Sequence, residues 1–206
     1  MKLFFDTETS GRADFAAPPD APQQPHLMSL AAVCTDDDYN EIISCNLIVK
    51  PHEKFKIEPG ALDAHGITWE RADEVGVPML TVLSLFYTMA KVSSYHIAYN
   101  YEFDKLIIQA ALARVMRPSG LSFPDQFAPE KALCEMNAMT DHCKIPKSFG
   151  RRGKGQQYKW PSLKEAYSKA TDGGSFANAH DAMADTRAMV TVHKWRMAVE
   201  AEGVSP

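Results

Sequence analysis

The chain begins with an apolar run, Leu3-Phe4-Phe5, that leads without a break into the acidic segment Asp6-Thr7-Glu8. A short, uninterrupted apolar run is typical of a buried strand in the middle of a sheet. Asp6 therefore lies at the border of the core, where an unpaired charge is costly. Residues two apart on a strand point to one face, so Asp6 and Glu8 can meet the same cation, which would remove that cost.

The apolar runs that follow predict how the sheet is built. Runs at 28–34 and 41–49 flank a turn at Asp36-Asp37-Asp38, which predicts a hairpin, and with 2–6 they form an antiparallel meander. Further strands are expected at 95–99 and 131–136, and helices near residue 61 and at 78–92, 102–116, from Ser162 onward and at 181–201. This order predicts an α/β fold with a mixed, five-stranded sheet, in which parallel strands follow the meander and helices flank the sheet.

Length and composition indicate an ordinary globular protein. The 206 residues suit one domain over 1–206, and the chain is 45% hydrophobic and 23% charged. The 4 cysteines form no C-x-x-C pair, which argues against a zinc knuckle and suits a reducing cytoplasm. We see no signal peptide and no apolar run long enough to cross a bilayer, so a cytoplasmic protein that does not bind membranes is expected.

Two segments stand outside the predicted elements. Residues 11–26 are rich in proline and are expected to form a long, mobile loop over the end of the first strand. Residues 144–159 contain glycines and six basic side chains but no acid, although the net charge of the chain is -4. Such a stretch can hold a phosphate backbone, which makes Arg151 and Arg152 candidate substrate-binding residues. A solvated loop without a ligand is an equally open interpretation.

Two more acidic segments lie far along the chain. Asp104 falls in the first turn of the helix that follows the strand at 95–99, where the helix dipole alone could favour it, and Asn100 is the predicted N-cap. Asp185 falls at the start of the last helix, and His180 precedes it by five residues. That spacing places His180 on the preceding loop, above the site, rather than on the same helical face.

These residue types together indicate metal-dependent phosphodiester hydrolysis. Mg²⁺ or Mn²⁺ prefers carboxylate and water oxygens, and two such ions can activate a water molecule and stabilise the leaving 3′ oxygen. A neutral histidine near the water can take its proton. Asp181 is a helix-start acid and a weaker ligand candidate, and the lone histidines His65, His96 and His193 are by default expected at the surface.

The motifs resemble those of the DEDDh exonucleases, the DnaQ-like family that includes the proofreading subunit of bacterial replicative polymerase. Asp6-x-Glu8-Thr9-x-Gly11 resembles its first motif, Asn100-x-x-Phe103-Asp104 its second and His180-x-Ala182-x-x-Asp185 its third. The segment 65–68, His-Gly-Ile-Thr, is also similar to one common in that family. The related DEDDy group has a tyrosine where this chain has Asp181, so the histidine form fits.

The resemblance implies an RNase H-like fold and 3′→5′ hydrolysis that releases nucleoside 5′-monophosphates. It implies that Asp6, Glu8, Asp104 and Asp185 hold two divalent ions, Mg²⁺ or Mn²⁺, and that His180 is the general base. It also implies that four further residues lie near the terminal nucleotide: Thr9, His65, Asn100 and Phe103.

The expected substrate is a nucleic acid with a free 3′ end, with single-stranded DNA preferred, and the protein could serve a polymerase or repair complex. Two alternatives stay open. RNA-trimming enzymes of the same superfamily use the same carboxylates, and the sequence does not show a contact to the 2′-hydroxyl. The second alternative is a binding module with little activity of its own. The presence of a suitable residue at all five catalytic-type positions argues against it.

Overall fold

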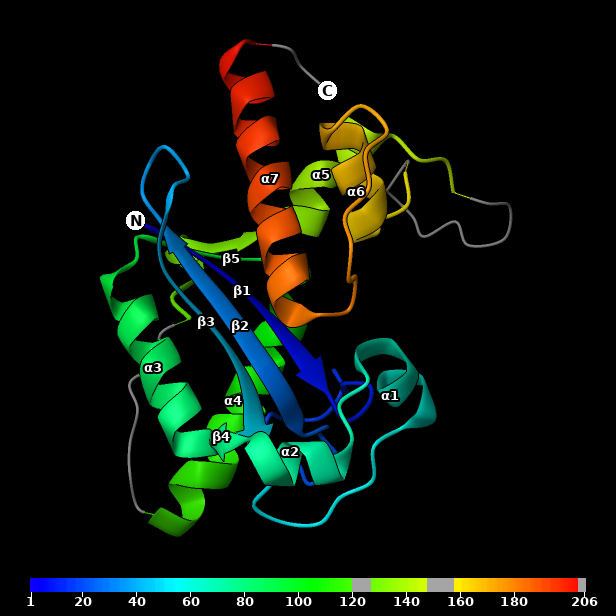
Figure 1. The fold of residues 1–206 in the computed structure, drawn as a ribbon. Helices are drawn as coiled ribbons and strands as arrows, with labels where there is room; N and C mark the ends of the chain where they lie inside the picture. Colours follow the sequence, from blue (N-terminus) through cyan, green and yellow to red (C-terminus); the bar gives the residue numbers. More distant parts are fainter. Residues whose placement is uncertain (120–126, 148–157, 204–206) are drawn as a thin grey trace.

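The computed structural model describes residues 1–119, 127–147 and 158–203, with only the backbone of 117–119. Within these ranges its centre is a 6-stranded sheet of order β4-β3-β2-β1-β5-β6 (Figure 1). The strands are β1 (Lys2–Thr9), β2 (Leu27–Thr35), β3 (Glu41–Lys50), β4 (Val77–Pro78), β5 (Tyr95–Ala98) and β6 (Ala132–Cys134). The α/β class and the mixed sheet with its antiparallel meander are thus confirmed.

The central strand β1 carries the first acidic segment along its length rather than after its end. It pairs antiparallel with β2 and parallel with β5, and its pairing with β2 continues through Asp6↔Ala31 and Glu8↔Ser29 to Thr9. The strand is longer than the predicted 2–6 because backbone hydrogen bonding does not stop at the first charge. Asp6 and Glu8 therefore share one face of the sheet, as their spacing predicts.

Helices cover both faces of the sheet. They are α1 (Pro59–His65), α2 (Trp69–Val75), α3 (Met79–Val92), α4 (Tyr101–Ser119), α5 (Glu135–Cys143), α6 (Leu163–Ala170) and α7 (Ala182–Ala201), with a 3-10 turn at Pro129–Lys131. Helices α3 and α4 lie on one side of the sheet and α7 on the other (Figure 1). Phe5 of β1 contacts α3 and α4, and Phe4 points to the opposite face, where it packs with Met189 of α7. In the described part of the chain, no helix is long and apolar enough to span a membrane.

The sequence missed three elements, and the predicted count of five strands is wrong. The sixth strand, β4, has 2 residues and pairs parallel with β3 at Val49↔Val77. A strand this short has no side-chain period, and only its backbone hydrogen bonds define it. Helix α2 was also missed, and the strand expected at 131–136 ends at Cys134, where α5 begins. The predicted capping box of α6, between Ser162 and Glu165, is present.

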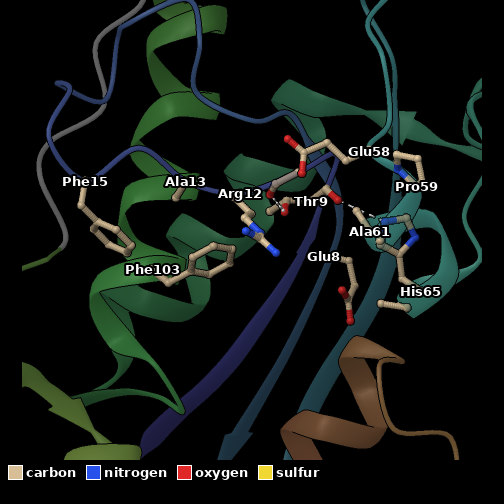
Figure 2. Close-up of a pocket in the computed structure, with 13 residues that line it drawn as sticks. Glu8, Thr9, Arg12, Ala13, Phe15, Glu58, Pro59, Ala61, His65 and Phe103 are labelled. Carbon is tan, nitrogen blue, oxygen red and sulfur yellow. Dashed lines mark hydrogen bonds between the residues drawn. The ribbon is translucent and has the colours of Figure 1, made fainter. Parts of the chain in front are cut away.

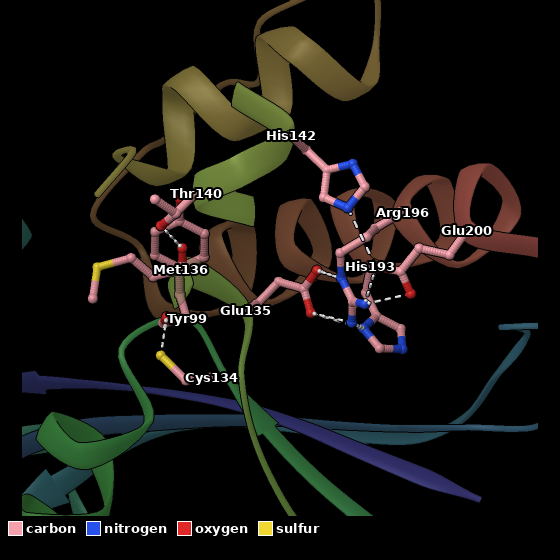
Figure 3. A network of polar contacts seen from close by, with 9 residues as sticks. All are labelled: Tyr99, Cys134, Glu135, Met136, Thr140, His142, His193, Arg196 and Glu200. Carbon is pink, nitrogen blue, oxygen red and sulfur yellow. Dashed lines mark hydrogen bonds and ion pairs between the residues drawn. The ribbon is translucent and has the colours of Figure 1, made fainter. Parts of the chain in front are cut away.

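A buried ionic network fixes α7 to the start of α5 (Figure 3). Glu135, which has no exposed surface, accepts hydrogen bonds of 2.8 Å from His193 Nδ1 and 2.8 Å from Arg196 Nε. Arg196 also pairs with Glu200 at 2.8 Å. Burial would raise the pKa of Glu135, but the hydrogen bonds from His193 and Arg196 outweigh it and hold the pKa below its usual value. The network sets where α7 lies on the sheet.

The expectation that His96 and His193 lie at the surface is wrong. His96 is fully buried and its Nε2 lies 2.9 Å from the carbonyl oxygen of Ala90, and His193 is 2% exposed. His193 Nδ1 bonds Glu135, which lies far away in the sequence, and the ring of His96 packs against the end of α3. A local pattern does not reveal such tertiary contacts.

The proline-rich loop, 11–26, contains no helix or strand, as predicted, and hydrogen bonds join its parts to one another and to α4. Gln24 is 1% exposed. Its amide Nε2 donates to the carbonyl of Asp14 at 2.8 Å, and its Oε1 accepts from the Asp14 amide at 3.1 Å. Arg114 of α4 donates to the carbonyl of Pro25 at 3.0 Å. The loop is therefore folded around one buried side chain and tied to α4.

Loss of a partner from the buried ionic network should reduce stability much more than loss of an exposed ion pair. Glu135→Ala leaves His193 and part of Arg196 buried without their partner, so the free energy of unfolding should fall by about 3–5 kcal/mol. Glu74→Ala removes an exposed pair with Arg71, 3.8 Å long, and should cost less than about 1 kcal/mol. Chemical denaturation measures both, and equal small losses would show that the network does not brace α7.

Candidate functional site

Three carboxylates meet where β1 passes beneath the N-terminal turn of α7. One oxygen each from Asp6, Glu8 and Asp185 lies within 4.8 Å of the others, and all three side chains are partly buried. Asp6 and Glu8 share the strand face that α7 covers, and Asp185 lies in the first turn of that helix. The predicted convergence of the first and third acidic segments is present.

Asp104 joins the group from the other side of β1. It is 3% exposed in the first turn of α4, and its Oδ1 accepts hydrogen bonds from the backbone amide of Thr7, at 2.9 Å, and from the Thr7 hydroxyl, at 2.7 Å. Thr7 lies between the two acids of β1 and points to the opposite face, toward α4. Both hydrogen bonds end on Oδ1, so Thr7 fixes the position of the carboxylate and leaves Oδ2 of Asp104 without a bond from Thr7.

The carboxylates repel one another at close range. Burial, followed by the charges of Asp104 and Glu8, raises the pKa of Asp6 well above its usual value. Burial and the charges of Asp185 and Asp104 raise the pKa of Glu8 to about 8. Burial raises the pKa of Asp104 to about 7, although its bonds from Thr7 oppose the rise. Burial also raises the pKa of Asp185, against the backbone hydrogen bond from His180.

The turn before α7 places His180 and Asp185 together. Asp181 is the N-cap, and its Oδ1 accepts from the amides of Met183, at 3.1 Å, and Ala184, at 2.9 Å. His180 is exposed on the preceding loop, with a left-handed φ of 73°, and its backbone amide lies 3.2 Å from Oδ2 of Asp185. The geometry agrees with a helix-capping Asp181 and with a histidine above the site.

A hard divalent cation fits this donor set. The side chains offer carboxylate oxygens, which Mg²⁺ and Mn²⁺ prefer, and no thiol is among them. Like-charged buried acids with raised pKa values are costly unless a cation neutralises them. Asp6, Glu8 and Asp185 are the three groups whose atoms already converge, and Asp104 lies next to them.

A pocket of about 670 Å³ opens beside Glu8 (Figure 2). Its wall comes from the end of β1, the proline-rich loop, α1 and α4. In Figure 2, Phe15 and Phe103 lie at one side, Glu8 and His65 at the other, and the guanidinium of Arg12 between them. The backbone at Gly11 passes so near Glu58 that a Cβ would come within 2.7 Å of its side chain, so a larger residue there would displace this wall.

The segment 65–68 is a corner between two helices that fixes the ring of His65. Gly66 ends α1 with a left-handed φ of 68°, and Thr68 caps α2. The amide of Ile67 donates to Nδ1 of His65 at 2.9 Å, so Nε2 carries the proton and donates to the carbonyl of Thr9 at 3.1 Å. Burial lowers the pKa of His65. His65 is a neutral wall of the pocket with both nitrogens engaged.

A second pocket of about 360 Å³ lies on the other side of Glu8. His180 and Asp181 line it together with Arg71 of α2, Ser29 of β2 and Asn46 of β3. Glu8 and His65 line both pockets, so these two side chains lie between an aromatic pocket and a polar one.

The remaining predicted residues divide into two groups. Thr9 and Phe103 line the aromatic pocket, although the Thr9 hydroxyl already donates to the carbonyl of Gly11 at 2.6 Å. Asn100 is exposed, and its carbonyl accepts from the amide of Phe103 at 2.9 Å, as in an N-cap. The candidates Arg151 and Arg152, with most of the basic segment 144–159, lie outside the described residues.

Sequence reasoning missed four residues that shape the site: Thr7, Arg12, Phe15 and Arg71. The role of Thr7 could have been predicted from the sequence. Side chains alternate along a strand, so a residue between Asp6 and Glu8 points to the opposite face, toward a helix that packs there. The other three reach the site through the path of a loop or through the unpredicted helix α2, and no local pattern marks them.

The bond from Thr7 to Asp104 makes a sharp prediction. Thr7→Val keeps the volume and removes the hydroxyl donor, so Asp104 loses one of its anchors, and divalent metal affinity should fall about 10- to 100-fold. Thr7→Ser keeps the donor and should bind metal like the original protein. Calorimetric titration with Mn²⁺ compares them, and unchanged affinity in Thr7→Val would remove Thr7 from the site.

The raised pKa values predict how pH and metal together affect stability. The carboxyls of Glu8, with a pKa of about 8, and Asp104, with a pKa of about 7, hold protons more tightly in the folded chain than unfolded. Stability of the metal-free protein should therefore fall as pH rises from about 5 to 8. Because Mg²⁺ offsets the charge, its increase in Tm should be larger at pH 8 than at pH 6. Glu8→Gln should reduce this difference, and an equal Mg²⁺ effect at both pH values would contradict it.

Comparisons with known proteins agree with this geometry. The family model described as RNase_T, exonuclease, matches residues 3–193. Among solved structures, E. coli exonuclease I in complex with a dT13 oligonucleotide superposes with a TM-score of 0.68 at 23% identity, over 96% of this chain and 40% of that chain. Exonuclease I from Methylocaldum szegediense gives a TM-score of 0.67 at 22% identity, over 98% and 40% of the two chains.

The structural matches show a shared RNase H-like fold, as predicted, and this chain spans about two fifths of the length of those proteins. A search of curated protein sequences finds no relative of this chain. Exonucleases of the matching family depend on divalent metal ions. Since the family model covers most of its length, this chain belongs to the exonuclease family, as the resemblance of its motifs to the DEDDh exonucleases predicts.

Proposed function

We propose that this protein is a two-metal 3′→5′ exonuclease that acts on single-stranded DNA and releases nucleoside 5′-monophosphates. The observation that carries the proposal is the convergence of Asp6, Glu8 and Asp185 within 4.8 Å, between a nucleotide-sized aromatic pocket and His180. Asp104, held by Thr7, completes the set of four carboxylates.

Each side chain has a role in the proposed reaction. Asp6, Glu8, Asp104 and Asp185 would hold two ions, Mg²⁺ or Mn²⁺, and these would supply activation of the attacking water and neutralise charge on the leaving 3′ oxygen. His180 accepts the proton of the attacking water as the water oxygen bonds to phosphorus and the bond to the 3′ oxygen breaks. The backbone amide of His180 bonds Asp185, so the proposed base starts from a backbone position next to the carboxylates.

The aromatic pocket is the proposed site for the 3′-terminal nucleoside. Phe103 offers an apolar ring for the base, and Thr9 and His65 form the wall nearest Glu8. Because both nitrogens of His65 are engaged, it would contact the nucleotide through ring carbons. That Asn100, Arg151 and Arg152 contact the substrate stays a prediction.

DNA is the proposed substrate because the related exonuclease I structures include complexes with DNA oligonucleotides. RNA remains the alternative, since the carboxylates address the phosphate and not the sugar. A binding module without activity is disfavoured by the complete carboxylate set. One exonuclease I structure is a complex with SSB-Ct, and an assembly of this chain with a polymerase or repair complex stays a prediction.

We further propose one exonuclease domain over 1–206, which the family match to 3–193 supports. Cytoplasmic localisation stays a prediction.

Digestion of end-labelled oligonucleotides tests the reaction. With Mg²⁺ or Mn²⁺, a 5′-labelled single-stranded DNA should shorten stepwise, and a 3′-labelled one should release labelled mononucleotide at once. RNA and blunt duplex run in parallel decide the substrate. Asp185→Asn and EDTA should each abolish hydrolysis. Internal cleavage, or release of mononucleotide from the 5′ end, would refute the proposal.

The histidine base predicts a specific mutant phenotype. His180→Ala should lower kcat about 10²- to 10⁴-fold and remove the acid limb of the pH–rate profile, because the proton acceptor is lost. Asp181→Asn is the matched control, since Asn also caps helices, and it should retain most activity. If Asp181→Asn lost as much activity as His180→Ala, the assignment of the base to His180 would fail.

A further inference from the structure

The proline-rich loop presents two side chains to the aromatic pocket that the family motifs do not include. Arg12 and Phe15 follow Gly11, and both line the pocket (Figure 2). The buried amide of Gln24 fixes the backbone nearby, because it bonds the amide and the carbonyl of Asp14, which lies between them in the sequence. The loop backbone that carries these two side chains is therefore fixed at Asp14.

The ring of Phe15 is largely exposed to solvent, and a ligand in the pocket would cover it. Its side chain is 62% exposed, the largest fraction among the exposed large hydrophobic residues in the described part of the chain. It lies on the same side of the pocket as Phe103, which is half-buried against the core. An exposed ring beside a second ring forms a stacking surface for a flat, apolar group, and nucleobases stack well on such rings.

Arg12 is a cation beside the acidic cluster, and among the described residues it forms no ion pair or hydrogen bond. It is exposed, and its guanidinium lies between the ring of Phe103 and the carboxylate of Glu8 (Figure 2). A guanidinium in this place offers a fork of donors to an anion. The substrate that passes from the carboxylates into the pocket carries such anions, its phosphodiesters.

We infer that Arg12 and Phe15 form a clamp for the 3′ end of the substrate, an inference that rests on the proposed exonuclease function. Phe15 stacks with Phe103 on the terminal base, and Arg12 binds a phosphodiester oxygen of the strand. Stacking requires a base that is not paired, so the clamp selects single-stranded or frayed 3′ ends. Any base has a face that can stack, so the selection is tolerant of sequence.

Phe15 is tested with a substrate that lacks the terminal base. Binding of an oligonucleotide with a normal 3′ end and of one with an abasic 3′ end is measured for the original protein, Phe15→Ala and Phe15→Trp. Phe15→Ala should weaken binding of the normal end roughly 5- to 150-fold and leave the abasic end almost unchanged. Phe15→Trp should bind the normal end well. An equal loss on both ends would show a structural role and overturn the clamp.

Arg12 is tested by salt dependence. Arg12→Ala should weaken binding and reduce the slope of log affinity against log salt by about 0.7, the share of one phosphate on a single strand. Arg12→Lys should keep most of the slope but lose part of the affinity. The matched controls are Lys91→Ala and Tyr95→Ala, exposed residues on α3 and at the start of β5, which should change nothing. An unchanged slope in Arg12→Ala would remove Arg12 from the clamp.

The clamp and the proposed reaction can fail separately. Both binding tests work without hydrolysis, so an inactive protein that discriminates normal from abasic 3′ ends would retain the clamp and lose the exonuclease proposal. An active 3′→5′ exonuclease whose Phe15→Ala variant degrades both ends with equal loss would retain the function and lose the clamp.

Discussion

The structure depends on the repulsion between carboxylates that the fold forces together. Asp6 and Glu8 share one strand face, Asp185 approaches from α7, and Asp104 approaches from α4. Few hydrogen-bond donors oppose the repulsion: Thr7 serves Asp104, and the backbone of His180 serves Asp185. Burial raises the pKa values of all four acids, and the charges of neighbouring acids of the set add to the rise for Asp6 and Glu8. Such a cluster destabilises the folded chain unless cations occupy it. The repulsion that lowers stability is therefore also what favours cation binding.

The rest of the fold keeps these groups in position. The ladder between β1 and β2 continues through Asp6 and Glu8 and shifts register only between Glu8 and Thr9, so backbone pairing supports the strand beneath the site. The ionic network around Glu135 anchors α7 through His193 and Arg196, which opposes a shift of the whole helix that would carry Asp185 away from the other acids. A stable scaffold elsewhere thus maintains a locally unfavourable arrangement, which is a common feature of functional sites.

Much of this could be predicted from the sequence because the information is local. The run Leu3-Phe4-Phe5 and its acids defined the central strand, the spacing of apolar residues defined α3, α4 and α7, and the capping box of Ser162 marked α6. The choice of the motif acids and His180 as candidates rested on residue type, order and the resemblance of the motifs. The structure brings Asp6, Glu8 and Asp185 together, and the roles of these residues stay predictions. Local patterns failed where long-range contacts decide, as in the two-residue β4, the burial of His96 and His193, and the positions of Arg12, Phe15 and Arg71.

The central claim, that four distant acids form one site for divalent cations, is tested most directly by counting bound ions. Calorimetric titration of the metal-free protein with Mn²⁺ near pH 8 should show saturable binding of two ions, with Asp6→Asn losing at least one of them. No measurable binding, or binding that is identical in Asp6→Asn and the original protein, would contradict the claim.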